Sequence, residues 1–138
     1  MSRQIIRDLL ETRLETWAAA QNPPIPLAHE NQDVLTTQTK PYFRIYLLPA
    51  QTQIIALEGA GREYNGVFQI TTVFDMGIGT ATIEAMEASL DALFPVNLRL
   101  TESGVTVQIL SPMTGAPLIE EPDVVSCAVS CQYRAYVI

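Results

Sequence analysis

Apolar and polar residues alternate along the last part of the chain, from Asp123 to Ile138. Every second residue of this stretch is apolar, namely Val125, Cys127, Val129, Cys131, Tyr133, Ala135 and Val137. A period of two is typical of a β-strand with one buried face. No proline or glycine interrupts the run, so we expect a strand in the interior of a sheet rather than at its edge.

Two more stretches predict strong strands. Residues 42–48 place Phe43, Ile45 and Leu47 on one face, and Arg62–Asp75 places Phe68, Ile70 and Phe74 on one parity. Gly66 inside the second stretch indicates a bulge or a close approach of another backbone. Weaker patterns predict a short edge strand over residues 25–29 and a hairpin of residues 98–100 with 105–109.

Two segments show helical periodicity instead. Residues 2–20 carry an apolar stripe of Ile6, Leu9, Leu10, Leu14 and Trp17, and residues 81–94 carry one of Ile83, Met86, Leu90, Leu93 and Phe94. Thr80 is the expected N-cap of the second helix. The order of elements predicts an α+β fold, a mainly antiparallel β-sheet with two α-helices packed against it, in one domain spanning residues 1–138.

The second predicted helix carries small residues on the face opposite its apolar stripe. Its small residues line up in an alanine ridge formed by Ala81, Ala85, Ala88 and Ala92. Such a ridge allows close approach of another helix, which would be the first helix or part of a neighbouring subunit. The alternative is that the alanines only raise helix propensity. Glu84, Glu87 and Asp91 run along one flank, where we expect an acidic, solvated surface.

The segment from Gln51 to Gly61 combines apolar residues with a glycine-rich turn. Ile54, Ile55 and Leu57 precede the sequence Glu58-Gly59-Ala60-Gly61. This pattern suits an arm that reaches out from the body and contacts a neighbour, together with Arg62 just beyond it. An ordinary hairpin explains the same pattern equally well.

The composition offers little for catalysis or nucleic-acid binding. The net charge is −7, with 8 basic residues and no basic cluster, so tight nucleic-acid binding is not expected. A single histidine, His29, leaves no Ser–His or metal–His constellation. Cys127 and Cys131 would lie about 13 Å apart in a strand, beyond the limit of about 7 Å for bridged Cα atoms. They are therefore predicted to be small buried hydrophobes, and no catalytic residue, metal or cofactor is assigned.

Three further features of the sequence give weaker indications of function or location. Gly77-Ile78-Gly79 resembles part of a dinucleotide fingerprint, but Thr82 stands where the third glycine belongs, so a flexible connection to the helix explains it. Glu120 and Glu121 are expected to be a solvated acidic surface, with a small enzyme using them as the less favoured alternative. Neither a membrane span nor a signal peptide is visible, which predicts a cytosolic protein.

Several stretches taken together resemble the tail terminators of tailed bacteriophages, a family related to the minor tail protein U type. These stretches are the opening helix over residues 5–20, the segments Pro41–Ala50 and Gly61–Ile70, the Gly77/Gly79 loop before a helix ending Leu93-Phe94-Pro95, and the closing Gln132-Tyr133-Arg134-Ala135. The likeness covers nearly the whole chain in order.

This resemblance implies a structural virion protein without enzymatic activity. It implies a homo-oligomeric ring, expected to have six subunits, that caps the tail tube, ends its polymerisation and offers a docking surface to the head-completion protein. The alternative is a neck or head–tail connector protein of the same particle. Partners would be further copies of the chain, the tail tube protein and the head-completion protein, with DNA passing through and no membrane involved. In such a ring, the acidic residues would line the lumen or lie on the outer surface, namely Glu84, Glu87, Asp91, Glu120 and Glu121. The protein would be found in the virion tail, and in the host cytoplasm during assembly.

Overall fold

The computed structural model describes residues 2–21, 24–28, 41–50, 53–54 and 62–137. Within these residues the chain forms two helices and nine strands, in the order α1 (Ser2–Ala19), β1 (Leu27–Ala28), β2 (Tyr42–Pro49), β3 (Gln53–Ile54), β4 (Arg62–Asp75), α2 (Thr80–Leu93), β5 (Arg99–Glu102), β6 (Val105–Ile109), β7 (Thr114–Gly115), β8 (Ile119–Glu120) and β9 (Val124–Val137). The predicted α+β class is confirmed.

The sheet is built around two long neighbouring strands, β4 and β9. Its strand order is β1-β2-β4-β9-β6-β5, with β3 continuing the β2 side of β4 and with β7 and β8 continuing the β6 side of β9. All pairs are antiparallel except the short parallel pair of β1 with β2. The C-terminal strand β9 therefore lies inside the sheet, and the short segment β1 lies at its edge, as the sequence predicts.

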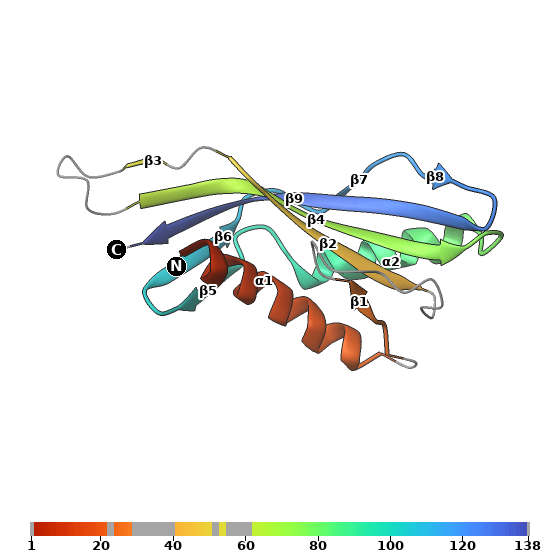
Figure 1. The fold of residues 1–138 in the computed structure, drawn as a ribbon, viewed down its shortest axis with the longest axis horizontal. Helices are drawn as coiled ribbons and strands as arrows, with labels where there is room; N and C mark the ends of the chain where they lie inside the picture. The colour runs from red at the N-terminus through yellow and green to blue at the C-terminus, as the bar shows by residue number, and fades with distance from the viewer. Residues whose placement is uncertain (1, 22–23, 29–40, 51–52, 55–61, 138) are drawn as a thin grey trace.

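Both helices pack on the same face of the sheet (Figure 1). The ring of Trp17 in α1 stacks against Phe43 of β2, with centroids 6.1 Å apart. Phe94, at the end of α2, meets the edge of Phe68 in β4, with centroids 5.4 Å apart. Phe43 and Phe68 belong to the apolar parity of their strands, so the alternation in the sequence correctly identifies the face that the helices cover.

The core lies between this face and the helices. Every odd-numbered residue of β9 from Val125 to Ala135 is buried, and so are Phe43, Ile45 and Leu47 of β2. From the helices, Leu10, Leu14 and Leu90 are fully buried. The two cysteines are buried and not disulfide-bonded, which confirms their prediction as small core residues.

The opposite side of the sheet is covered by neither helix. We call it the open sheet face and define it by the side chains of the other parity, namely Tyr42, Arg44, Tyr46 and Leu48 of β2, Glu63, Asn65, Val67, Gln69, Thr71, Val73 and Asp75 of β4, and Ser126, Ala128, Ser130, Gln132, Arg134 and Tyr136 of β9. Val73 is only 3% exposed, so the face is covered at that position. The register places Gln108 of β6 and Arg99 of β5 on the same face, beside Arg134. An antiparallel sheet with one face packed and the other free of helices has this two-sided character.

Three details differ from, or sharpen, the sequence-based expectation. Thr80 is the first residue of α2 rather than its N-cap. The N-cap is Gly79, with a φ of 92°, and it has no side chain that could cap the helix. The segment after Pro112 contains the short strands β7 and β8, which the sequence did not predict. Gly66 marks a close approach, as expected, because a Cβ there would lie 2.5 Å from the carbonyl oxygen of Leu48.

Candidate subunit interface and surface groove

The alanine ridge of α2 points away from the core. Ile83 and Leu90 form the buried side of the helix, whereas Ala81, Ala85, Ala88 and Ala92 are all exposed. The possibility that the ridge packs against the first helix is therefore wrong. A ridge of small exposed side chains remains open to contact with another molecule, and its role as a subunit interface stays a prediction.

The acidic flank of α2 divides into an exposed part and an inward part. Glu84 is exposed, but Glu87 is half-buried and accepts a hydrogen bond from the Cys127 thiol at 2.8 Å. Asp91 is exposed and accepts the backbone N–H of Met113 at 3.0 Å. Two of the three acids thus connect α2 to β9 and to the segment that leads into β7, rather than only facing solvent.

A signal for the inward position of Glu87 exists in the sequence. Glu87 lies four residues after Ile83 and three before Leu90, and this spacing places all three on one side of a helix. The structure also places its carboxylate beside Gly115 of β7, where a Cβ would meet the Glu87 oxygens at 2.9 and 3.1 Å. The glycine therefore makes room for the acid.

The two thiols are held in their protonated form. Burial raises the pKa of Cys127 from 9.0 to about 12, and the hydrogen bond and negative charge of Glu87 act in the same direction. Burial also raises the pKa of Cys131 to about 12, with a further contribution from the charge of Asp91. Because thiolates are the nucleophiles and metal ligands, neither cysteine is prepared for such chemistry at neutral pH.

The remaining residues singled out from the sequence do not gather at one place. Glu120 of β8 and its neighbour Glu121 are exposed, as predicted for a solvated acidic surface. Ile54 belongs to β3 and is paired with Arg62 of β4. Ile55, Leu57 and His29 lie outside the described residues, as do the side chains of Ile54 and Arg62.

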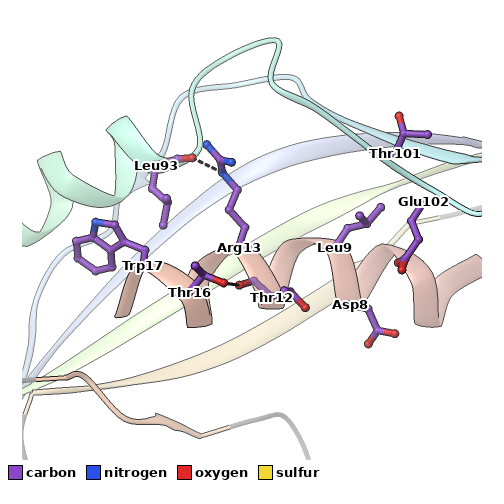
Figure 2. Close-up of a pocket in the computed structure, with 9 residues that line it drawn as sticks. All are labelled: Asp8, Leu9, Thr12, Arg13, Thr16, Trp17, Leu93, Thr101 and Glu102. Atoms are coloured by element: carbon purple, nitrogen blue, oxygen red, sulfur yellow. Dashed lines mark hydrogen bonds between the residues drawn. The ribbon is translucent and has the colours of Figure 1, made fainter. Parts of the chain in front are cut away.

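One groove of about 540 Å³ opens between α1, the end of α2 and β5 (Figure 2). Leu9, Trp17 and Leu93 give it apolar walls, and Asp8 and Glu102 lie together at one end. Its other lining residues are Thr12, Arg13, Thr16 and Thr101. The lining contains no histidine or cysteine, so the groove offers neither a nucleophile–base pair nor a soft metal ligand.

Arg13 lies in the middle of this groove, between Trp17 and Leu9, and joins the two helices (Figure 2). Its Nε donates a hydrogen bond of 2.7 Å to the carbonyl oxygen of Leu93, the last residue of α2 (Figure 2). Carbonyl groups at a helix C-terminus lack partners within the helix and carry partial negative charge, so a guanidinium there is favourable. The sequence did not identify this role, because Arg13 and Leu93 are 80 positions apart.

Across the described parts of the chain, no cluster of three or more His, Cys, Asp or Glu side chains is arranged to bind a metal ion. None of the helices described is long and apolar enough to cross a membrane.

Comparison with known proteins then identifies the family. The model of the family described as phage tail terminator protein matches residues 5–133. Among five matching chains of solved structure, one has a TM-score of 0.82 and 34% sequence identity, and the match covers 98% of this chain and 96% of the other. A comparison with curated proteins gives no match. The chain therefore belongs to the phage tail terminator family, a structural and non-enzymatic family of the virion tail.

Proposed function

We propose that this protein assembles into a ring of identical subunits that caps the tail tube. The ring ends polymerisation of the tube and provides the docking surface for the head-completion protein. Membership of the tail terminator family, which implies association with the tail tube, is the observation that carries this proposal. The same match favours a terminator over the neck connector that the sequence left as an alternative.

Features of the chain support a function based on shape and assembly. A closed ring requires each subunit to present two different, complementary surfaces. The alanine ridge supplies an exposed helical surface on which side chains do not hinder close approach. The net charge of −7 suits a conduit for DNA, because like charges repel and contact with the wall releases no counterions.

The test is to replace Ala88, in the middle of the ridge, with arginine. Ala88 is exposed, so Ala88→Arg should leave the circular dichroism spectrum and the melting temperature unchanged. We expect electron microscopy to show rings on tail tubes with the wild-type protein, and tubes of uncontrolled length with the variant.

Ala19→Arg is the matched control, since Ala19 is also exposed but lies at the end of α1. This control should cap tubes normally. Normal capping by Ala88→Arg would remove the ridge from the interface. A wild-type protein that neither forms rings nor limits tube length would refute the proposed function itself.

A further inference from the structure

The open sheet face has the composition of a protein interface. It carries the aromatic residues Tyr42, Tyr46 and Tyr136 together with Leu48, Arg44 and Arg134. Lysine is absent from this face among the described residues, and Glu63 is already paired with Arg134 at 3.7 Å. Tyrosine and arginine are enriched in interfaces, whereas lysine and glutamate are depleted there relative to the rest of a protein surface.

The two sides of the molecule also differ in charge. On the helices, the described charged side chains that are exposed are all acidic: Asp8, Glu15, Glu84 and Asp91. Arg7 and Arg13 are only partly exposed, and they contact Glu11 and the Leu93 carbonyl. On the open sheet face and its β5 margin, the exposed charges are Arg44 and Arg99, with Asp75 at the end of β4.

We propose that the open sheet face of one copy is the docking surface for helix α2 of the next copy in the ring. This inference rests on the proposed function and specifies the contact from which the ring is built. In this contact the alanine ridge lies on the sheet, and Glu84 faces Arg44. The two surfaces of each subunit are different and complementary, which is the requirement for a head-to-tail ring.

Helix α2 fits within the length of the open sheet face. Helix α2 has 14 residues and is about 21 Å long, while the 14-residue strands β4 and β9 extend about 46 Å. The flanking strands β2 and β6 have 8 and 5 residues, so they extend only about 26 and 17 Å, and the four strands together present on the order of 650 Å². Helix α2 therefore covers part of this face and leaves room for further contacts between the two copies. Alanine side chains allow the helix backbone to lie close to the sheet.

The charges of the two surfaces favour contact of helix α2 with the open sheet face over two alternatives, namely pairing of two helix layers and binding of DNA. Pairing of two helix layers would place acidic side chains against acidic side chains, which is unfavourable. DNA is the remaining candidate for a face that exposes arginines. However, Arg134 already donates to Gln108 at 3.0 Å, contacts Glu63 and lies over the Tyr136 ring at 4.8 Å. Phosphate binding requires clustered basic residues, which this face lacks among the residues described.

The experiment exchanges the two charges. Arg44→Glu and Glu84→Arg are made singly and together, and ring formation is measured by sedimentation velocity and electron microscopy, with tail tubes present and absent. Each single variant should raise the protein concentration needed for ring formation by at least about tenfold, because it juxtaposes like charges. The double variant should assemble as the wild type does.

An equimolar mixture of the two single variants should also form rings in which the variants alternate. At one contact, the acid introduced by Arg44→Glu meets the base introduced by Glu84→Arg, and at the next contact the original Arg44 and Glu84 meet. Asp8→Arg makes the same change of charge on α1 and should assemble normally.

The outcomes separate this contact from the ring itself. Assembly of Arg44→Glu at wild-type concentrations, or failure of both the double variant and the mixture, would overturn the contact while the ring stands. Retained rings with weakened binding of double-stranded DNA in Arg44→Glu would assign the face to DNA instead. If the wild-type protein forms no rings even on tail tubes, the proposed function fails first. Circular dichroism of each variant confirms that it is folded.

Discussion

Gly66 is the position at which a single methyl group should disturb this fold most directly. The residue lies in β4, opposite Pro49 of β2 and Tyr133 of β9. A Cβ at this position would lie 2.5 Å from the carbonyl oxygen of Leu48, 2.7 Å from the hydroxyl oxygen of Tyr133 and 2.8 Å from a carbon of its ring. The carbonyl belongs to the main chain of a paired strand, so it cannot move without disturbing the ladder between β2 and β4.

The size of the effect follows from two opposing contributions. Inserting a methyl group into a well-packed site costs about 1–3 kcal/mol, whereas replacing glycine by alanine gains about 0.4–1 kcal/mol from the lower entropy of the unfolded chain. Because the backbone of β2 and the Tyr133 ring of β9 are both too close for a Cβ, we expect a packing cost in the upper part of the roughly 1–3 kcal/mol range. The free energy of unfolding should therefore fall by about 2 kcal/mol in total. With an unfolding entropy of about 2.1 cal/mol/K per residue, the melting temperature of Gly66→Ala should fall by about 7 °C.

Thermal and urea unfolding followed by circular dichroism measure this loss. Gly115→Ala is the matched control, since the nearest atoms to a Cβ there belong to the carboxylate of Glu87, at the end of a flexible side chain. That side chain can withdraw, so the control should lose less than about 1 kcal/mol. If Gly66→Ala were as stable as the wild type, the close approach of β2 and Tyr133 to β4 would be wrong.

Three other predictions concern stability. Arg13→Gln should lower the free energy of unfolding by about 1–2 kcal/mol in urea titrations, because a charged donor leaves the end of α2. The pKa values of Cys127 and Cys131 are raised from 9.0 to about 12. Between about pH 9 and 12 only the unfolded chain releases these protons, so the free energy of unfolding should be constant with respect to these thiols below pH 9 and should fall as the pH rises from about 9 towards 12. Alkylation of the two thiols in the native protein at pH 7 should be slow. Leu47 is 2% exposed and Leu48 48%, so Leu47→Ala should cost about 2–5 kcal/mol and Leu48→Ala less than about 0.5 kcal/mol.

The long elements were predictable because each has one face in the core. In β9 and β2 a buried face forces apolar residues into every second position, and the structure buries those positions. The same reasoning places Phe68 and Phe94 in the core, where their rings meet. The spacing of apolar residues predicts which side chains are buried, and it can be read from the sequence without knowing which strands pair.

Short strands and polar contacts were harder to predict from the sequence. Strands β7 and β8 have two residues each, and they pair with β9 through backbone groups. Backbone pairing does not depend on side-chain type, so it produced no pattern in this proline-rich segment. Glu87 was assigned to solvent because of its charge, although its spacing from Ile83 and Leu90 placed it on the inner side of the helix.

In the proposed ring, folding and assembly depend on different residues of the same strands. On β2, Leu47 belongs to the core and Leu48 to the open sheet face, although they are neighbours in sequence and identical in type. Substitutions on the inner parity therefore act first on the stability of the monomer. Substitutions at exposed positions of the open parity, such as Leu48 and Arg44, should leave the monomer folded. The proposed ring depends on this separation, because each subunit must bury its core completely while its contact surfaces stay exposed for the next copy.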